Sequence, residues 1–169
     1  MENIKKIILK DVFGVQKSKL KQSAAAITKV SESSVNEFLD KTQILDAKMN
    51  EAMLARKDIL EIIGGKKNIS TMKDIHINNL NFIGSILQTP DPDTLVDTTL
   101  WTFRAYMSRG FTSNYFAAQI NTWIQLIKEN ISTKSFLEIN SIYNWIGVNI
   151  PSFAIAAQKE LENQKLMSK

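Results

Sequence analysis

His76 is the only histidine in the chain and the only candidate for an axial haem ligand. A helical histidine beside large apolar side chains, here Phe82, Ile83, Trp101 and Phe103, is compatible with a haem pocket. The residues immediately around it are polar, however, and they favour a structural or partly exposed histidine. We therefore expect no haem and no other cofactor.

Several further side chains with binding chemistry surround a predicted helix–glycine–helix corner at Gly110. Aromatic rings can enclose a ligand, and an arginine among them can meet a carboxylate or phosphate. The alternative is a packed corner in which Arg104 satisfies the carbonyl groups of a helix end. The residues of the predicted ligand pocket are His76, Trp101, Arg104, Tyr106 and Tyr115.

Three aspartates, Asp91, Asp93 and Asp97, raise the alternative of a metal site. The string Pro90-Asp91-Pro92-Asp93 is also typical of a turn followed by a helix start. There Asp91 suits the N-cap and Pro92 the first helical position. Capping explains the spacing without a metal ion, so we expect none.

The composition excludes several classes of catalytic site. The chain has no cysteine, which rules out disulfides, thiolate zinc sites, iron–sulfur clusters and thiol nucleophiles. One histidine is too few for a two-histidine metal site. The string Gly64-Gly65-Lys66-Lys67 lacks the upstream strand and glycine of a phosphate-binding loop. These observations indicate that the protein is not an enzyme.

The chain of 169 residues is 44% hydrophobic and contains only six glycines and three prolines, which favours long helices over a β-sandwich or barrel. We predict an all-α fold, either globin-like or a bundle of five to seven helices. Besides a longer helix over 35–63, helices are expected at about 71–88, 92–109, 113–130 and 133–150, where Pro151 should kink or end the last one. A polar helical tail should follow over 152–167.

The longest predicted helix covers about residues 35–63. Its apolar residues recur at alternating spacings of three and four, with interruptions at Thr42 and Arg56, as in a coiled-coil seam. Such a helix would be roughly 43 Å long, which is long for a body of this size. We therefore expect a homodimer, although the same seam could pack internally. The predicted seam residues are Val35, Phe38, Leu45, Met49 and Ile59.

Positive charge is concentrated at the N-terminus. Residues 1–30 contain seven lysines and two acidic residues and sum to +5, so the rest of the chain sums to −1 for a net charge of +4. We interpret 1–30 as a basic helical arm and 31–169 as a single all-α domain. Residues 3–13 suit weak contact with a membrane surface or a partner, or else belong to a solvated arm. Only Phe13 accompanies the lysines, so we expect no nucleic-acid binding.

The chain shows no sign of membrane insertion or export. It has no apolar run of the roughly 18 residues that a membrane-spanning helix needs. The stretch from Met1 to Lys10 lacks the apolar core and cleavage pattern of a signal peptide. We therefore predict no transmembrane segment and a cytoplasmic location.

The order of helices and aromatic residues in the second half of the chain resembles that of a known family. A helix with Phe103-Arg104-Ala105 ends at Gly110-Phe111-Thr112-Ser113, a second helix carries Phe116, Trp123 and Leu126, and a long final helix carries Phe153. Over residues 98–161 this order resembles the second half of the haem-free globin-like sensor domains of bacterial stress-signalling and sporulation-control proteins. The resemblance implies a globin-like fold and a signalling role.

We therefore predict a non-enzymatic helical sensor or regulatory module. It would bind a small apolar or amphiphilic ligand or a partner protein of a signalling system. The alternative is a structural dimerisation or scaffold protein built on the 35–63 helix.

Overall fold

A computed structural model describes residues 14–167, with side chains up to Lys165. Every regular element in this range is helical, which confirms the all-α prediction, and the helices outnumber the predicted five to seven. After a helical segment over 14–24, the elements are α2 (Glu32–Asp40), α3 (Thr42–Leu54), α4 (Ile59–Ile62), a 3-10 turn (Lys66–Asn68), α5 (Ile69–Gln88), α6 (Pro92–Met107), α7 (Ser113–Asn130) and α8 (Thr133–Met167).

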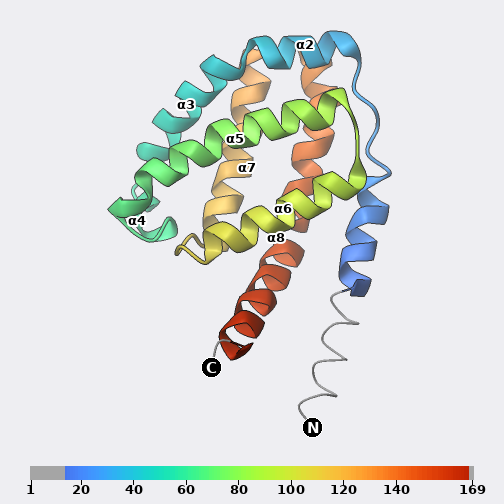
Figure 1. The fold of residues 1–169 in the computed structure, drawn as a ribbon. Coiled ribbons are helices and arrows are strands. Elements are labelled where there is room, and N and C mark those ends of the chain that lie inside the picture. Colours follow the sequence, from blue (N-terminus) through green and yellow to red (C-terminus); the bar gives the residue numbers. More distant parts are fainter. Residues whose placement is uncertain (1–13, 168–169) are drawn as a thin grey trace.

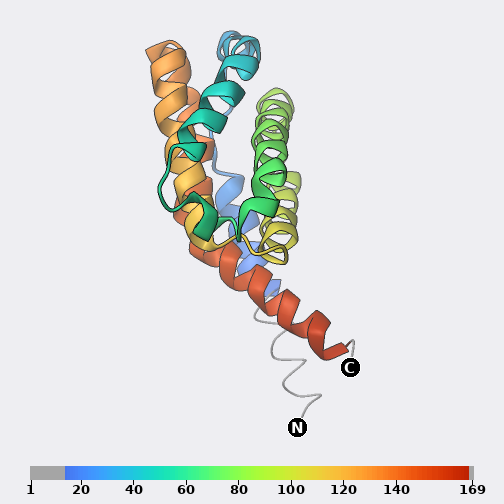
Figure 2. The same cartoon turned by 90° about the vertical axis from the view of Figure 1, so that its left-hand side faces the viewer.

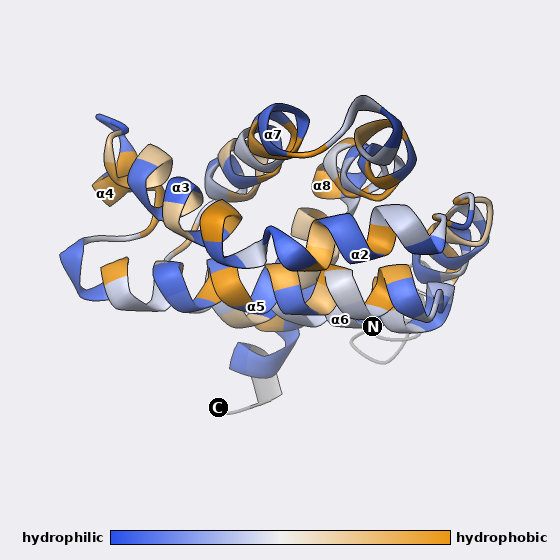
Figure 3. Ribbon diagram, turned by 90° about the horizontal axis from the view of Figure 1, so that it is seen from above, coloured by the Kyte–Doolittle hydropathy of each residue, from blue (hydrophilic) through white to orange (hydrophobic). Residues whose placement is uncertain are grey.

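The helices form two layers. Helices α5 and α6 lie on one side of the molecule and α7 and α8 on the other, with α2 and α3 across one end (Figures 2 and 3). Helix α8 is the longest and packs against α7, α6 and α2. Its C-terminal part extends beyond the other helices (Figure 1). None of the helices in the described part combines the length and apolar character needed to cross a membrane.

The predicted single helix over 35–63 is wrong, because this stretch forms α2, α3 and α4. The two polar interruptions of the seam lie at the breaks. The Thr42 hydroxyl donates to the carbonyl of Leu39 (2.9 Å) at the first break. Arg56 pairs with Asp58 through two hydrogen bonds of 2.9 and 2.8 Å at the second. The apolar spacing therefore marks a buried face that continues across three helices.

The predicted seam is part of the chain's own core. Each of its residues is at most 6% exposed and packs with apolar side chains of the other helices. A partner chain could reach them only if this core opened, so the interpretation as an exposed dimer seam is corrected. The residues concerned are Val35, Phe38, Leu45, Met49 and Ile59.

Residues 14–30, the described part of the predicted basic arm, pack on the body. Lys17 pairs with Asp97 of α6 at 2.9 Å, and Lys21 pairs with Asp93 at 3.2 Å. The segment shares the core of the other helices through Leu20, Ala24 and Val30. This segment therefore packs as part of the body, although its charge balance indicated a separate arm. The proposed amphipathic helix over 3–13 lies outside the described residues.

Helix α8 continues through Pro151, where we expected a kink or an end. The proline ring would meet the carbonyl of the residue four positions earlier, which is Gly147. A glycine there gives the backbone freedom to tilt this carbonyl away. Proline is therefore accommodated inside the helix.

The N-terminal ends of α2 and α8 cap each other. Glu37 of α2 accepts hydrogen bonds from the backbone N–H (2.6 Å) and hydroxyl (2.7 Å) of Ser132 and from the hydroxyl of Ser135. Glu138 of α8 accepts one from the backbone N–H of Ser31 (2.7 Å). Each carboxylate thus satisfies an N–H group that a helix start leaves without an intrahelical partner. We call this arrangement the reciprocal cap.

The same pattern, Ser-x-x-Ser-x-x-Glu, stands at both helix starts, over 31–37 and 132–138. The two serine hydroxyls lie 3.0 Å apart in the first copy and 3.1 Å apart in the second. A local reading of the sequence pairs Ser34 with Glu37 as a capping box. In the structure α2 begins earlier, at Glu32, and Glu37 reaches across to the other helix.

We expect the double variant Glu37→Gln/Glu138→Gln to have a lower thermal unfolding midpoint than the wild type at pH 7. Hydrogen bonds, mainly from Ser135, lower the pKa of Glu37 below its ordinary value of 4.5. Hydrogen bonds from Ser31 lower the pKa of Glu138 in the same way. The stabilising contribution of the two carboxylates is therefore present above about pH 4.5 and is lost as the pH falls further. Thermal unfolding followed by circular dichroism at about pH 7 and pH 3.5 checks this. The difference in unfolding midpoint between the wild type and the double variant should be smaller at the lower pH.

The matched control is Glu32→Gln, which removes an exposed carboxylate from the first turn of the same helix. It should change the midpoint much less than the double variant does. A difference that stays constant with pH would show that the reciprocal cap does not act through ionised carboxylates.

Candidate functional site

The predicted pocket residues separate into a buried and an outer group. His76 and Tyr115 are fully buried between α5 and α7, with nearly parallel rings whose centroids lie 6.4 Å apart. Phe111 stacks edge-on to Tyr115 at 4.8 Å and contacts the half-buried Tyr106 at 5.7 Å. Tyr106 is thus linked to the buried pair through the ring of Phe111.

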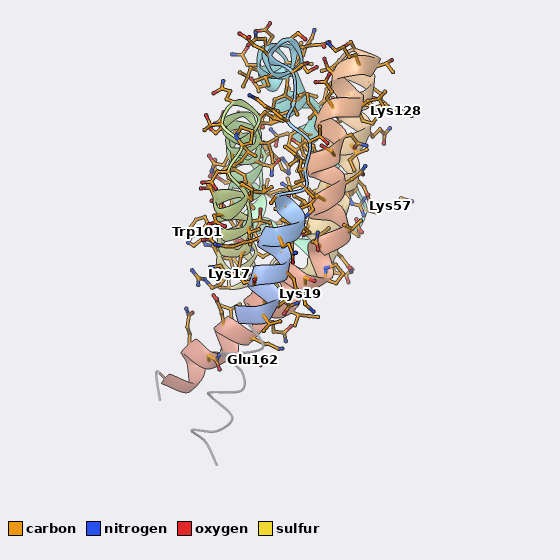
Figure 4. The ribbon with its side chains drawn as sticks, turned by 90° about the vertical axis from the view of Figure 1, so that its right-hand side faces the viewer. Lys17, Lys19, Lys57, Trp101, Lys128 and Glu162 are labelled. Atoms are coloured by element: carbon orange, nitrogen blue, oxygen red, sulfur yellow. The ribbon has the colours of Figure 1, made fainter. Side chains whose placement is uncertain are left out.

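The other two predicted residues lie on α6 away from this pair. Trp101 is 55% exposed and stands on the outer surface (Figure 4). Arg104 forms a half-buried ion pair with Glu160 that joins α6 to α8. The guanidinium therefore meets a carboxylate, as predicted from its chemistry, but the carboxylate belongs to the protein. The five residues do not line one pocket.

A contact between two glycines positions the starts of α5 and α7. Gly64 has φ +77°, and a Cβ on it would lie 2.8 Å from the carbonyl oxygen of Gly110. The side-chain amide of Asn68 donates to the carbonyls of Ile63 (2.6 Å) and Arg109 (2.9 Å) and holds the two turns together. Because α5 and α7 begin immediately after these turns, the contact sets how their side chains meet.

His76 is held by hydrogen bonds on one side of its ring only. Its Nδ1 lies 2.7 Å from Oδ1 of Asn50 on α3, and the Asn50 amide nitrogen donates to Asp46 at 3.2 Å. Because the Asn50 nitrogen donates to Asp46, the Asn50 oxygen accepts the hydrogen bond from Nδ1–H of His76. Nε2 of His76 therefore carries no proton and can only accept a hydrogen bond. Burial lowers the pKa of His76 to about 3, so the imidazole is neutral at neutral pH.

Besides Oδ1 of the half-buried Asp46, four buried polar atoms in this region have no hydrogen-bond partner among the residues that the structure describes. The side chains of these four atoms are at most 3% exposed. Three of these residues follow one another at intervals of four along α7 and so share a face, and the Trp123 ring stands edge-on to that of His76 at 6.2 Å. We call this set the His76 cluster: His76 (Nε2), Tyr115 (Oη), Gln119 (Nε2) and Trp123 (Nε1).

Flexible apolar side chains border the His76 cluster. Met49 and Met53 flank Asn50 on α3, and Met72 lies one turn before His76 on α5. All three methionines are fully buried. The backbones of α5 and α7 make few direct contacts, because α3 packs against both of them and lies between them (Figure 2). Because methionine adapts its shape readily, this interior can accommodate a small occupant by changes of rotamer.

A surface hollow of about 250 Å³ lies elsewhere, between residues 24–30, the α5–α6 turn and α8. Its buried floor is apolar, and the exposed Lys29 and Asp91 stand at its rim. The floor residues are Ile86, Leu87, Leu95 and Ile142. None of the predicted pocket residues lines this hollow.

The three aspartates considered as metal ligands have other partners. Asp91 caps α6 by accepting the backbone N–H of Asp93 (3.0 Å), and Pro92 is the first helical residue, which confirms the predicted helix start. Asp93 and Asp97 pair with lysines of the N-terminal helical segment. Within residues 14–165 the structure shows no group of three or more acidic or histidine side chains arranged to hold a metal ion.

Gln119 and Trp123 were not predicted as site residues, although the sequence holds a signal for them. Gln119 interrupts the apolar face of α7 one turn after Tyr115 and one turn before Trp123. A polar residue on a predicted buried face is unfavourable unless it has a partner. Asn50 lies next to Met49 but off the predicted seam and is half-buried, so its hydrogen bond to His76 had no such signal.

Comparisons with protein-family models, with curated proteins and with solved structures find no match for this chain. The resemblance of residues 98–161 to haem-free globin-like sensor domains therefore stays a prediction. The site has to be interpreted from its own chemistry.

We expect mild acidification to destabilise the protein through His76. Its pKa of about 3 in the folded chain lies below the ordinary 6.5, so the unfolded chain takes up the proton first. The contribution of neutral His76 to the free energy of unfolding is fully present above pH 6.5 and is lost as the pH falls toward 3. The free energy of unfolding should fall by up to about 1.4 kcal/mol per pH unit in this range. Urea unfolding between pH 7 and 5 should show this slope in the wild type and a flatter one in His76→Leu.

The window from pH 7 to 5 separates this effect from the reciprocal cap, whose carboxyls titrate below their ordinary value of 4.5. Equal slopes in wild type and His76→Leu would contradict a neutral, buried His76.

Proposed function

We propose that this protein is a non-enzymatic helical sensor or regulatory module that binds a small amphiphilic ligand at the His76 cluster. The observation that carries the proposal is the set of four buried polar atoms without a partner among the described residues. Each such atom costs about 1–3 kcal/mol if nothing satisfies it. A core that served packing alone would place apolar side chains at these positions.

The chemistry of His76 supports binding over catalysis. A general acid or base works best with a pKa near the working pH. The pKa of His76 is about 3, which leaves the imidazole a hydrogen-bond acceptor that does not exchange protons near neutrality. The Asp46–Asn50–His76 chain of hydrogen bonds holds the ring and so positions this acceptor.

The packing of α7 supports a regulatory role for such binding. Tyr115, Gln119 and Trp123 lie on α7, and α7 packs along α8, whose C-terminal part extends beyond the body (Figure 2). In the family that residues 98–161 resemble, the terminal helix transmits the signal to an output module. We propose the same role for α8, with the Arg104–Glu160 pair holding its C-terminal half to α6.

We expect native mass spectrometry of the purified full chain to show a bound small molecule in the wild type. The double variant Tyr115→Phe/Gln119→Leu should lose it, because two polar groups are removed while the volume is nearly kept. The ligand-free variant should also be more stable than the ligand-free wild type, since each unsatisfied group that is removed had cost about 1–3 kcal/mol.

The matched control is Trp101→Phe, which changes an exposed aromatic residue outside the His76 cluster. It should keep the bound molecule. A wild type without any bound molecule, combined with a double variant that is less stable, would show that the His76 cluster is satisfied within the protein.

The second candidate function is dimerisation, and the outer face of α8 favours it. Leu137, Val148 and Ile155 are 69%, 76% and 50% exposed. Spacings of eleven and seven residues place them on one face of the helix. An antiparallel pair of α8 helices that cross near Val148 would bring Leu137 of one copy within about one turn of Ile155 of the other. The homodimer prediction is therefore kept, with this face in place of the buried seam.

We expect the wild type to sediment as a dimer at micromolar concentration and Val148→Glu/Ile155→Glu to sediment as a monomer. Both side chains are exposed, so the variant should keep the helical circular dichroism of the wild type. Trp101→Glu, an equally exposed position on α6, is the matched control and should remain dimeric. A monomeric wild type would refute this candidate.

A further inference from the structure

We propose that the ligand of the His76 cluster presents a neutral group that both donates and accepts a hydrogen bond, as a hydroxyl or a primary amide does. This inference rests on the proposed ligand-binding function and adds the chemical class of the ligand. Its basis is the donor and acceptor character of the four unpartnered atoms.

The His76 side of the cluster requires a donor on the ligand. The Asn50 amide is oriented by its hydrogen bond to Asp46, and this places the ring proton of His76 on Nδ1. Nε2 therefore offers a lone pair and no proton. A ligand atom that contacts Nε2 has to carry an N–H or O–H group.

The Trp123 side requires an acceptor. The indole nitrogen of tryptophan is a donor only, and here it has no partner among the described residues. A ligand atom that contacts it has to carry a lone pair. The unpartnered Nε2 of Gln119 is likewise a donor and also requires a lone pair on the ligand. The Tyr115 hydroxyl both donates and accepts, so it adapts to either demand.

A charged ligand group fails one of the two requirements. A carboxylate has no proton for Nε2 of His76, and an alkylammonium has no lone pair for the indole N–H of Trp123. The four residues of the cluster are uncharged, and the nearby carboxylate of Asp46 is separated from His76 by Asn50, so neither ion would find a countercharge within the cluster. Burying an ion without a countercharge is strongly unfavourable.

An ordered water satisfies the same donor and acceptor pattern and is the competing occupant. The three buried methionines, Met49, Met53 and Met72, favour an organic ligand, because their flexible apolar side chains can enclose a short alkyl chain. The experiment therefore uses probes that differ in the polar group and share one alkyl chain.

The test is titration of the full chain with 1-butanol, butyramide, butyrate and butylammonium at pH 7.5, followed by ¹H–¹⁵N NMR of the tryptophan side chains. The indole N–H resonance of Trp123, assigned from its absence in Trp123→Phe, should shift with the two neutral probes. The two charged probes should bind at least about tenfold more weakly. The Trp145 resonance is the internal control, since its N–H already donates to Ser23 (3.0 Å).

The relative affinities of the neutral and charged probes decide between the inference and its alternatives. Binding of butyrate or butylammonium as tight as that of the neutral probes would overturn the inference and leave the proposed function in place. If no probe shifts Trp123, the molecule found by native mass spectrometry decides: a neutral hydroxyl or amide compound supports the inference, and an acid or amine overturns it. If that spectrum also shows no bound molecule, ordered water alone fills the cluster, and the inference and the proposed function both fail.

Discussion

The reciprocal cap between α2 and α8 is the interaction on which the rest of the architecture depends. It joins the start of α2, which lies across one end of the two layers, to the start of α8, the longest helix in the described part of the chain. Because α8 packs against α7, α6 and α2, the register set at its N-terminus is passed to the elements of both layers. The Gly64–Gly110 contact then sets the starts of α5 and α7, and α3 packs against both of these helices.

The interior between α3, α5 and α7 combines full burial with polar atoms that have no partner among the described residues. Burial and missing partners are in conflict unless a further molecule supplies the hydrogen bonds. Fully buried Trp123 and Tyr115 bring large apolar surfaces that stabilise the core, while their polar atoms oppose burial. Burial also raises the pKa of Tyr115 and lowers that of His76, so both stay neutral. The result is a neutral polar site in an apolar interior, which suits recognition of an uncharged group.

Local signals in the sequence predicted the simpler parts of the fold correctly. Helices expected at 71–88, 92–109 and 113–130 are observed at Ile69–Gln88, Pro92–Met107 and Ser113–Asn130. Each is delimited by a nearby cap, proline or glycine whose effect reaches only a few residues.

The candidate site could be predicted only in part. The rings of His76 and Tyr115 lie together, whereas Trp101 and Arg104 lie elsewhere, because neighbours in sequence on a helix point to different sides.

The sequence alone determined the all-α class, the buried faces of the helices and the start of α6 at Asp91 and Pro92. These follow from periodicity and local backbone chemistry. Only the tertiary structure decided that 35–63 breaks into three helices, that Glu37 caps α8, and that Trp123 contacts His76. Periodicity states which face of a helix is buried, and the partner that covers this face comes from distant parts of the chain. Glu37 and Ser132 are 95 residues apart, and no local rule relates them.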